Sequence, residues 1–409
     1  MFAVTAARID VDDPLAGLVL GERPDPELPG DGWATVQVKA ASLNHHDVWT
    51  LRGVGISADR LPIVLGCDAA GLDGDGNEVI VHSVIGDPDA GGGDETLDPR
   101  RSLLSERYDG TFAGLVAVPR RNLVPKPAAL SFPEAACLPT AYLTAYRMLF
   151  DKSGAEPGAT VLVQGAGGGV ATALIVLGRA AGYRVWATSR SEEKREHAVE
   201  LGADQAFPPG ARLPERVDVV METVGQATWA HSVRSLRPGG RIVISGATSG
   251  DAPSAELTRI FFTQLTVTGS TMGTRDQLAR LARFCEQTGV RPVIDRVLPL
   301  DQARDGFAAM IAGDLFGKIV LAVLARGDDP RNPPGALRAR CGPRRSIARP
   351  EGLRPRADPA MAAYAASLAV SRATGWGSPR FRRSAERGPP GRPGRAIPAS
   401  PARDRRSPT

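Results

Sequence analysis

Along the second half of the chain, short apolar runs typical of strands alternate with segments of helical periodicity. Short apolar runs predict strands at residues 160–164, 184–188, 217–222 and 241–245. Helical segments are expected between them at 169–181, 192–201 and 227–236, and a further strand at 265–269 follows a helical segment around Phe261. Short buried strands that alternate with helices predict a doubly wound parallel sheet of the α/β class, covered on both faces.

The first 125 residues follow a different pattern, with short strands separated by Gly, Pro and Asp turns. We expect strands at residues 36–40, 78–81 and 112–118. Ser131, followed three residues later by Glu134, forms a capping-box pattern. This pattern predicts a helix from there through Leu143, where the β region gives way to the α/β region.

Length and composition exclude several classes of protein. The chain has 409 residues, enough for about two or three domains, and its 42% hydrophobic and 23% charged residues are typical of a globular protein. The four cysteines are far apart, which favours a reducing cytosol over a disulfide framework or a zinc knuckle. No signal peptide is expected at the N-terminus. The longest apolar stretch is broken by Arg179, Arg184 and several glycines, so no membrane span is expected.

The net charge of +5 is unevenly distributed. Residues 326–409 contain 19 Arg, no Lys, 6 acidic residues and 14 Pro, so this tail carries +13 and residues 1–325 carry −8. Such a composition predicts a disordered extension, or a read of GC-rich sequence in the wrong frame. The alternative is an electrostatic contact with nucleic acid or a membrane. A basic tail with few aromatic residues and no docking fold does not predict nucleic-acid binding.

The strongest local motif is a glycine-rich turn between an expected strand and an expected helix. Residues 161–171 read VLVQGAGGGVA, with Gly165, Gly168, Gly169 and Val170 at the turn. Glycines let a backbone approach a pyrophosphate closely, and a helix N-terminus offers free N–H groups. The context therefore predicts a dinucleotide site, and the alternative is a tight turn without a ligand.

The end of the next strand indicates which coenzyme binds. An NAD site usually has Asp or Glu there, but this chain has Ser189 and Arg190, with Lys194 one helical turn later. Two cations and a hydroxyl suit a 2′-phosphate, so we expect NADPH, with NADH as an alternative. The alternative is that these two cations are solvated loop charges without a role in coenzyme binding. Glu192 and Glu193 also reduce the local positive field.

Two later strand ends should reach the same edge of the sheet, where ligands of such folds bind. We expect Gly225 after the third strand to face the coenzyme, and Ser245, Gly246 and Ala247 after the fourth. Ordinary turn residues are the alternative at each of these positions.

Several motifs in order resemble the medium-chain dehydrogenase/reductase superfamily, and specifically its quinone oxidoreductase-like branch. They lie at residues 42–47, 62–71, 110–113, 143–146, 164–171, 269–273 and 317–321. The resemblance covers about residues 1–325. It implies a GroES-like catalytic domain at 1–130 and 272–325, with a Rossmann NADP-binding domain inserted at 131–271. It also implies coenzyme contacts at Thr271, Met272 and Lys318, and a homodimer formed through residues 267–269.

The resemblance raises the question of whether this protein binds zinc, because zinc-dependent relatives use Cys, His and Cys as catalytic ligands. The matching positions here are Asn44, Cys67 and Thr140, and two of these residue types are poor zinc ligands. The lobe that holds a structural zinc in relatives corresponds to residues 84–107, which contain no cysteine. His45 and His46 are adjacent, and on an extended segment they would point in opposite directions. We therefore expect no metal.

Without a metal, the expected reaction is hydride transfer from the coenzyme to a small-molecule acceptor, an activated C=C or C=O bond or a quinone. Asn44 and Thr140 are predicted to donate hydrogen bonds to the acceptor carbonyl, and the resemblance places Thr144 near the nicotinamide. The proton is expected from water or from Tyr142. Quinone-reductase relatives often carry Tyr where this chain has Trp49, which weakens the case for a quinone.

Two alternatives remain open at the level of sequence. One is a zinc-dependent alcohol dehydrogenase with an atypical ligand set. The other is a protein that binds NADPH without turnover and contacts RNA through its basic tail.

Overall fold

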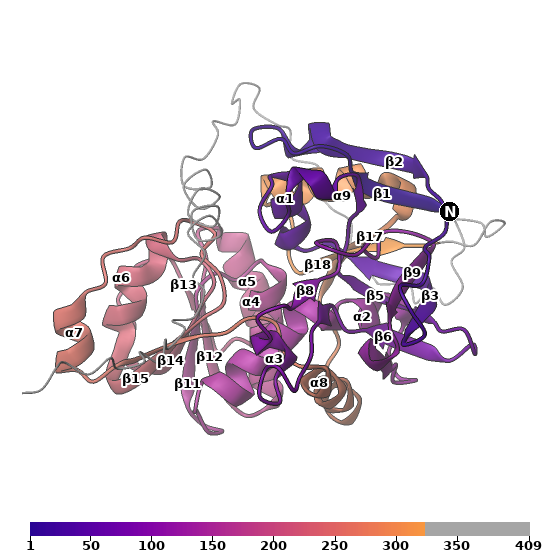
Figure 1. The fold of residues 1–409 in the computed structure, drawn as a ribbon. Helices are drawn as coiled ribbons and strands as arrows, with labels where there is room; N and C mark the ends of the chain where they lie inside the picture. The colour runs from indigo at the N-terminus through magenta and orange to yellow at the C-terminus, as the bar shows by residue number, and fades with distance from the viewer. Residues whose placement is uncertain (324–409) are drawn as a thin grey trace, which may run out of the picture.

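The computed structural model describes residues 1–323, and these form two large β-sheets that lie side by side, together with two smaller sheets (Figure 1). The parallel sheet, with α4–α7, occupies the left of that view, and the mainly antiparallel sheet occupies the right. The predicted tail at 326–409 lies outside the described residues. The fold class expected from the sequence, a Rossmann sheet joined to a GroES-like β domain, is confirmed.

The parallel sheet has the strand order β13-β12-β11-β14-β15-β16. Its strands are β11 (Thr160–Val163), β12 (Arg184–Thr188), β13 (Gln205–Phe207), β14 (Val217–Glu222), β15 (Leu236–Ile244) and β16 (Thr266–Gly269). The expected strands all form. Strand β13 was not predicted, because three residues are too few for a pattern. The start of β15 was also missed, where Pro238, Gly239 and Gly240 read as a turn.

Helices cover both faces of this sheet, as the apolar runs predicted. They are α4 (Gly169–Ala180), α5 (Glu192–Glu200), α6 (Gln226–Ser235) and α7 (Leu257–Phe262). Val161 and Val163 point to the face that packs against Leu174 of α4. Leu162 points to the opposite face, which packs against Val233 of α6. Alternate residues of one strand are therefore buried on opposite sides.

The helical segment that precedes the parallel sheet is longer than expected. Ser131 and Glu134 form the predicted capping box at α2 (Phe132–Ala136). The chain continues through α3 (Leu143–Arg147), with π-helical turns at Leu138–Tyr142 and Met148–Lys152. The helix was expected to end at Leu143, but apolar residues continue to face the core through Leu149.

The antiparallel sheet holds residues from both ends of the described chain. Its order is β10-β6-β5-β3-β18-β17, with β9 also paired to β3, and a smaller sheet has the order β2-β1-β4. The strands of these two sheets are β1 (Phe2–Ala6), β2 (Leu18–Glu22), β3 (Trp33–Ser42), β4 (Ile63–Val64), β5 (Asp68–Leu72), β6 (Glu78–Val81), β9 (Leu115–Pro119), β10 (Leu123–Pro125), β17 (Ile294–Pro299) and β18 (Lys318–Ala322). A separate two-stranded sheet pairs β7 (Val84–Ile85) with β8 (Ser102–Leu103). The run expected at 112–118 is a strand only from Leu115 onward.

The last described segment returns to this sheet after leaving the parallel one. It comprises α8 (Arg275–Thr288), β17, α9 (Ala303–Ala312) and β18. Phe307 of α9 packs edge-on against Phe112, with ring centroids 6.2 Å apart. Strand β18 pairs with β3 through Val320 and Ser42. The first and last parts of residues 1–323 therefore share one core.

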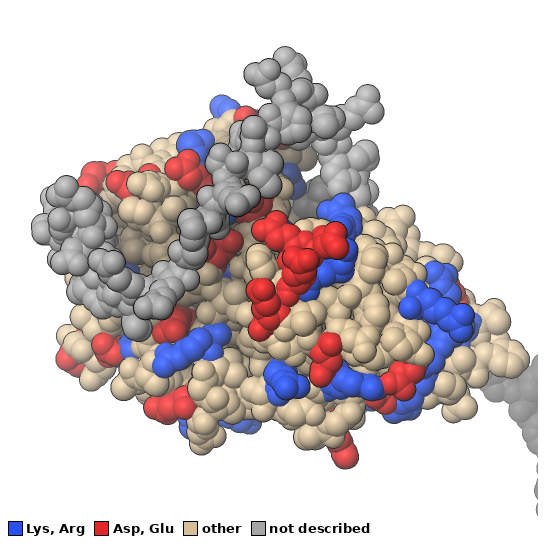
Figure 2. Space-filling view, turned by 180° about the vertical axis from the view of Figure 1, so that it is seen from behind, with Lys and Arg blue, Asp and Glu red and all other residues tan. Residues whose placement is uncertain are grey.

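The described surface carries both signs of charge. In Figure 2, acidic side chains gather near the centre of the face and basic ones lie on either side of them. Among residues 1–323, no helix is long and apolar enough to cross a membrane.

Candidate active site

The glycine-rich turn lies between β11 and α4, as predicted. Gly165 has a φ of +84°, which only glycine adopts at little cost. Gly168 caps α4, and no side chain among residues 1–323 accepts a hydrogen bond from the first N–H groups of this 12-residue helix. Gly169 and Val170 begin the helix. The helix start therefore presents free donors and a positive dipole end to a ligand phosphate.

Two polar residues that the sequence analysis missed hold this turn in place. The Thr188 hydroxyl donates to Gln164 Oε1 at 2.7 Å and accepts from the Gly165 N–H at 3.2 Å. Gln164 Nε2 donates to the Ser232 hydroxyl at 3.0 Å. All three side chains are buried among strand ends. A buried glutamine directly after an apolar strand was the available signal, since buried polar groups need partners.

The predicted 2′-phosphate residues follow β12. Ser189 is partly buried and Arg190 is exposed, and the structure shows no side-chain ion pair for Arg190 within residues 1–323. Lys194 Nζ donates to the Gly313 carbonyl at 2.9 Å, which links α5 to the end of α9. Its side chain also lies against Gly167 of the turn. The three residues thus lie at one edge of the sheet, and the Lys194 ammonium already donates a hydrogen bond to the end of α9.

The ends of β14 and β15 reach the same edge because the strands are parallel. Gly225 has a φ of +91°, and a Cβ there would lie 2.4 Å from the Gly250 carbonyl oxygen. Its N–H donates to Glu222 at 3.0 Å, a buried carboxylate that the sequence analysis did not single out. Ser245 begins the turn after β15, and its buried hydroxyl lacks a partner among the described atoms. The predicted residues Gly246 and Ala247 complete that turn.

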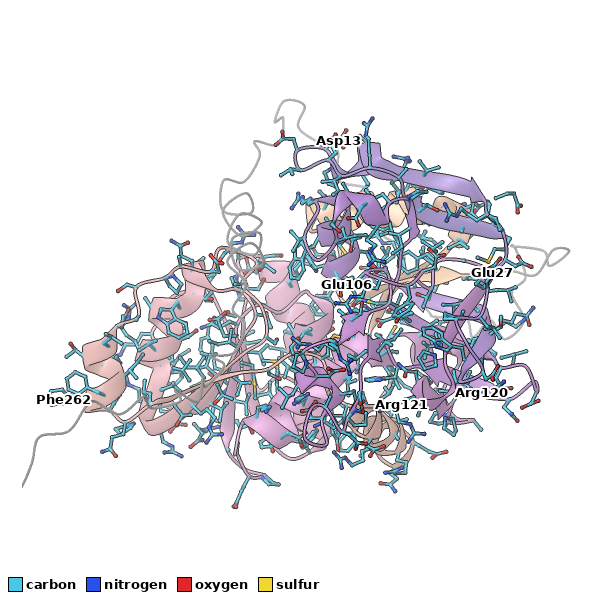
Figure 3. The ribbon with its side chains drawn as sticks, in the orientation of Figure 1. Asp13, Glu27, Glu106, Arg120, Arg121 and Phe262 are labelled. Carbon is cyan, nitrogen blue, oxygen red and sulfur yellow. The ribbon has the colours of Figure 1, made fainter. Side chains whose placement is uncertain are left out.

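The predicted residues Thr271 and Met272 lie beyond β16. Met272 is 9% exposed and has a φ of +48°, a conformation that a residue with a side chain rarely adopts. Both residues line a cavity of about 540 Å³ whose other walls come from the antiparallel part, including Ile56 and Glu106. In Figure 3, Glu106 is labelled where the two halves of the molecule meet. The cavity therefore opens at the boundary between the sheets.

The predicted catalytic residues Asn44 and Thr140 converge on Asp68, a fully buried carboxylate. Asn44 Nδ2 donates to Asp68 Oδ2 at 2.8 Å, and the Thr140 hydroxyl donates to Oδ1 at 2.5 Å. The Ser42 hydroxyl adds a third bond at 2.9 Å. Both predicted donors are thus bonded to Asp68. Ser42, Asn44, Asp68 and Thr140 are called the Asp68 cluster below. Thr144 is buried on α3, one helical turn after Thr140.

Lys318 supplies the positive charge that faces Asp68. Its Nζ lies 3.6 Å from Asp68 Oδ2 and donates to Asn44 Oδ1 and the Leu43 carbonyl, each at 2.6 Å. It is 2% exposed. Lys318 was predicted to contact the coenzyme. The structure places its ammonium in the Asp68 cluster, while its methylene chain packs against Gly169 of the turn.

The residues present do not fit the zinc site of the relatives. At the three ligand positions, Asn44 and Thr140 use their protons on Asp68, and only Cys67 could offer sulfur. Burial, together with the Asp68 charge, raises the pKa of the Cys67 thiol well above its ordinary value, which disfavours the thiolate that zinc requires.

A different trio, His46, Asp47 and Cys67, has ligand atoms within 4.8 Å of one another. Asp47 Oδ2 accepts the Asn44 N–H at 2.8 Å, and its Oδ1 accepts the Gly66 N–H at 3.1 Å. Its oxygens therefore already hold the backbone at the start of α1 (His45–Leu51). His46 Nε2 lies 3.3 Å from Glu106 Oε1.

Two sequence-based expectations about this region were wrong. His45 and His46 begin a helix, so they do not alternate as residues of an extended strand would. Tyr142 does not reach the site as an acid, because its fully buried hydroxyl accepts the Val293 N–H at 2.7 Å. Burial also raises the pKa of Tyr142 above its ordinary value.

Comparisons with known proteins agree with this geometry. Residues 30–128 match the family model of the alcohol dehydrogenase GroES-like domain, and residues 169–287 match that of zinc-binding dehydrogenases. The chain is 30% identical over 348 residues to a zinc-type alcohol dehydrogenase-like protein of Schizosaccharomyces pombe, covering 78% of this chain and 99% of that protein. This chain belongs to the medium-chain dehydrogenase/reductase superfamily of oxidoreductases.

Two further relatives illustrate the range of activities in the family. An acryloyl-coenzyme A reductase of Sulfurisphaera tokodaii is 28% identical, covering 76% of this chain and 98% of its own. The crystal structure of an NAD-dependent alcohol dehydrogenase is 35% identical with a TM-score of 0.73, and covers 79% of this chain and all of that one.

Proposed function

We propose that this protein is an NADPH-dependent reductase of activated C=C or C=O bonds or quinones, and that it works without zinc. The observation that carries the proposal is the joining of the glycine-rich turn to the Asp68 cluster. The Gly317 N–H donates to the Gly167 carbonyl at 2.9 Å, and the next residue, Lys318, extends into the cluster. The predicted phosphate site and the predicted acceptor site are therefore adjacent.

The coenzyme half of the proposal rests on the edge of the parallel sheet. The α4 N-terminus suits a pyrophosphate, and exposed Arg190 with nearby Lys194 suits a 2′-phosphate. The solved structure of a 2-octenoyl-coenzyme A carboxylase reductase in complex with NADP, 25% identical to this chain, is in keeping with NADPH. The NAD-dependent relative keeps NADH as the alternative.

NADPH would supply the hydride, which is delivered to an electron-poor carbon of the acceptor. The chain's own task is to hold and polarise the acceptor carbonyl. The Thr140 hydroxyl can rotate from Asp68 to an acceptor oxygen, and the rotation gives up one charge-assisted hydrogen bond. Lys318 and Ser42 continue to compensate the Asp68 charge when it does. Water is the proton source that remains, since Tyr142 is bonded elsewhere.

The acceptor class is supported by the absence of the relatives' ligand set at residues 44, 67 and 140. An activated alkene or a quinone spreads negative charge onto oxygen by itself, so it needs less Lewis-acid help than a simple ketone. The acryloyl-coenzyme A reductase among the relatives favours the activated alkene, as does Trp49, which lacks the hydroxyl of a tyrosine.

A direct test combines metal analysis with an acceptor screen on the full-length protein. We expect less than about 0.1 zinc per chain, and turnover of NADPH with enones, enoyl thioesters or quinones that is unchanged by a chelator. About one zinc per chain, with activity lost on chelation, would establish the zinc-dependent alternative instead. Coenzyme binding without turnover of any acceptor would favour a non-catalytic role.

A homodimer through the outer edge of the parallel sheet is part of the proposal. Strand β16 is an edge strand, and Val267 on it is 42% exposed. The neighbouring α7 exposes Phe261 and Phe262, at 64% and 76%. Figure 3 shows Phe262 at the far end of the molecule from the antiparallel sheet. The outer edge of this strand has no partner within residues 1–323, and an open edge next to exposed aromatic rings suits pairing with a second copy. Phe262→Asp should therefore shift the mass in light scattering towards the monomer.

Two other expectations stay predictions. They are the domain limits at 130, 271 and 325, and a location in a reducing cytosol. The three cysteines within residues 1–323 are free and buried, which is compatible with that location.

A further inference from the structure

The 540 Å³ cavity at the boundary between the sheets has a strongly basic lining. Arg60, Arg101 and Arg107 line it, and Glu106 is the single acidic residue among its described lining residues. None of the three arginines forms an ion pair with any residue in the range 1–323. Three positive charges against one negative charge leave this lining with a net charge of +2.

The arginines are held loosely and keep most of their donors. Arg101 Nη1 donates to the Asp98 carbonyl at 3.5 Å, and Arg107 Nη1 donates to the Arg100 carbonyl at 3.1 Å. These partners are neutral backbone oxygens, so neither guanidinium charge is compensated by them. All three arginine side chains belong to exposed residues, and they can therefore turn towards a ligand.

Glu106, in contrast, is already engaged. Its Oε1 lies 3.3 Å from His46 Nε2, and its Oε2 accepts the Leu103 N–H at 3.1 Å and the Ser102 hydroxyl at 3.4 Å. Burial alone lowers the pKa of His46, but the Glu106 bond and the Asp47 charge outweigh it and raise that pKa. The one carboxylate of the lining is therefore already bonded within the wall, which leaves the arginines as the dominant field in the cavity.

The cavity touches both parts of the proposed active site. Thr271 and Met272 bring the coenzyme edge of the parallel sheet to one wall. Glu106 in the opposite wall contacts His46 of α1, and the N-cap of that helix is Asn44 of the Asp68 cluster. An acceptor whose reacting end lies at Asn44 and Thr140 would extend its remainder into this space.

We propose that this cavity binds an anionic group of the acceptor, a phosphate or a carboxylate, through Arg60, Arg101 and Arg107. The inference rests on the proposed reductase function. Guanidinium groups bind both anions in a bidentate manner, and a concave site of one charge sign concentrates its field. The volume lies within the range of small-molecule sites, so it accommodates more than an isolated ion.

Two matched pairs of acceptors test the inference and identify the source of the anion. The phosphate pair is crotonyl-coenzyme A and the crotonyl thioester of N-acetylcysteamine, and the carboxylate pair is trans-4-oxo-2-pentenoate and 3-penten-2-one. The full-length protein is compared with a triple variant carrying Arg60→Gln, Arg101→Gln and Arg107→Gln. Arg120→Gln is the control, because Arg120 is exposed and lies far from Glu106 in Figure 3.

We expect the triple variant to raise KM at least tenfold for the anionic member of one pair, with kcat/KM for its neutral partner changed less than twofold. A selective loss with crotonyl-coenzyme A assigns the site to a phosphate, and one with the pentenoate assigns it to a carboxylate. Equal effects on charged and neutral acceptors, or none, would overturn the inference. If the wild type oxidises NADPH with none of the four acceptors, the proposed function is overturned instead.

Binding of an anion gives a readout that does not depend on turnover. Inorganic pyrophosphate in the calorimeter should bind the wild type and Arg120→Gln alike, in the presence of saturating NADPH, and bind the triple variant at least tenfold more weakly. If the triple variant misfolds by circular dichroism, Arg60→Gln alone serves for both measurements, with a smaller selective loss expected. Unchanged pyrophosphate binding would contradict the assignment.

Discussion

The carbonyl oxygen of Gly167 accepts a hydrogen bond of 2.9 Å from the backbone N–H of Gly317. This bond joins the turn after β11 to the start of β18, although the two glycines are far apart in the sequence. The side chain of the next residue, Lys318, then passes Gly169 and ends beside Asn44 and Asp68. One short segment thus connects the proposed coenzyme and acceptor sites.

Adjacent glycines of the turn should respond differently to alanine. A Cβ at Gly169 would lie 2.7 Å from Lys318 Cδ and 3.2 Å from Ala141 Cβ, whereas a Cβ at Gly168 meets no atom within 4 Å. We expect Gly169→Ala to destabilise the protein by about 1–3 kcal/mol. Gly168→Ala should change stability by less than about 0.5 kcal/mol and weaken NADPH binding. Thermal unfolding and coenzyme titration measure both, and equal stability for the two variants would contradict the packing.

Removing the Lys318 ammonium should destabilise the folded protein, because Asp68 is fully buried. Lys318→Met leaves that carboxylate without its cation, and we expect a loss of about 3–5 kcal/mol in the free energy of unfolding. Adding Asp68→Asn should restore part of the loss, since the amide carries no charge to compensate. Urea unfolding of the single and double variants measures this, and a loss that the second substitution deepens would refute the pairing.

The coenzyme preference should depend on Arg190. Arg190→Asp replaces the proposed partner of a 2′-phosphate with a carboxylate that repels it and suits a ribose hydroxyl. A charge-assisted hydrogen bond contributes about 1.5–3 kcal/mol, so the ratio of kcat/KM for NADPH over NADH should fall about 10- to 100-fold. Arg234→Asp, at an exposed position on α6, is the control. If the ratio stays constant in Arg190→Asp, the selectivity lies elsewhere.

Asp47 should make stability depend on pH in an unusual direction. Burial raises the pKa of Asp47 to about 6, above its ordinary value of 3.8. The folded state therefore holds this proton more tightly than the unfolded state, so the stabilisation is present at low pH and is lost as pH rises through 6. The stability of the wild type relative to Asp47→Asn should fall by about 2 kcal/mol between pH 4.5 and 7.

An exposed aspartate provides the opposite sign as a control. Hydrogen bonds from Asn77 lower the pKa of Asp73, so its contribution is lost as pH falls. The stability of the wild type relative to Asp73→Asn should therefore not decrease between pH 4.5 and 7. Chemical unfolding at both pH values gives each difference, and a flat difference for Asp47→Asn would contradict its burial as the cause.

The sequence was sufficient to predict the parallel sheet because its signals are local. A run such as residues 217–222 is apolar enough to be buried on both faces, and it forms β14 with those limits. The capping box at Ser131 is also local, and it forms as expected. Strand β13 and the first residues of β15 depend on neighbouring strands for their pairing, which no short window of sequence shows.

The sequence named candidate residues of the site but not the contacts between them. Asn44 and Thr140 were named as donors, but their common acceptor, Asp68, is fixed by the fold that brings β5 beside α1 and the helical turn at 138–142. Lys318 was placed at the coenzyme because a motif indicates a neighbourhood, not the atom that a flexible side chain reaches. The basic cavity combines loops and strand ends from distant parts of the chain, and no motif contains it.

The position of β18 between β3 and β17 determines the order in which a newly made chain can mature. Ribosomal synthesis delivers β3 more than 200 residues before its partner β18, so the antiparallel sheet waits for residues 318–322 while the parallel sheet already has every strand it needs. Long-range pairing of this kind is slow. Truncation before Lys318 would therefore leave an incomplete antiparallel sheet with an open interior edge, which is a target for chaperones and for aggregation.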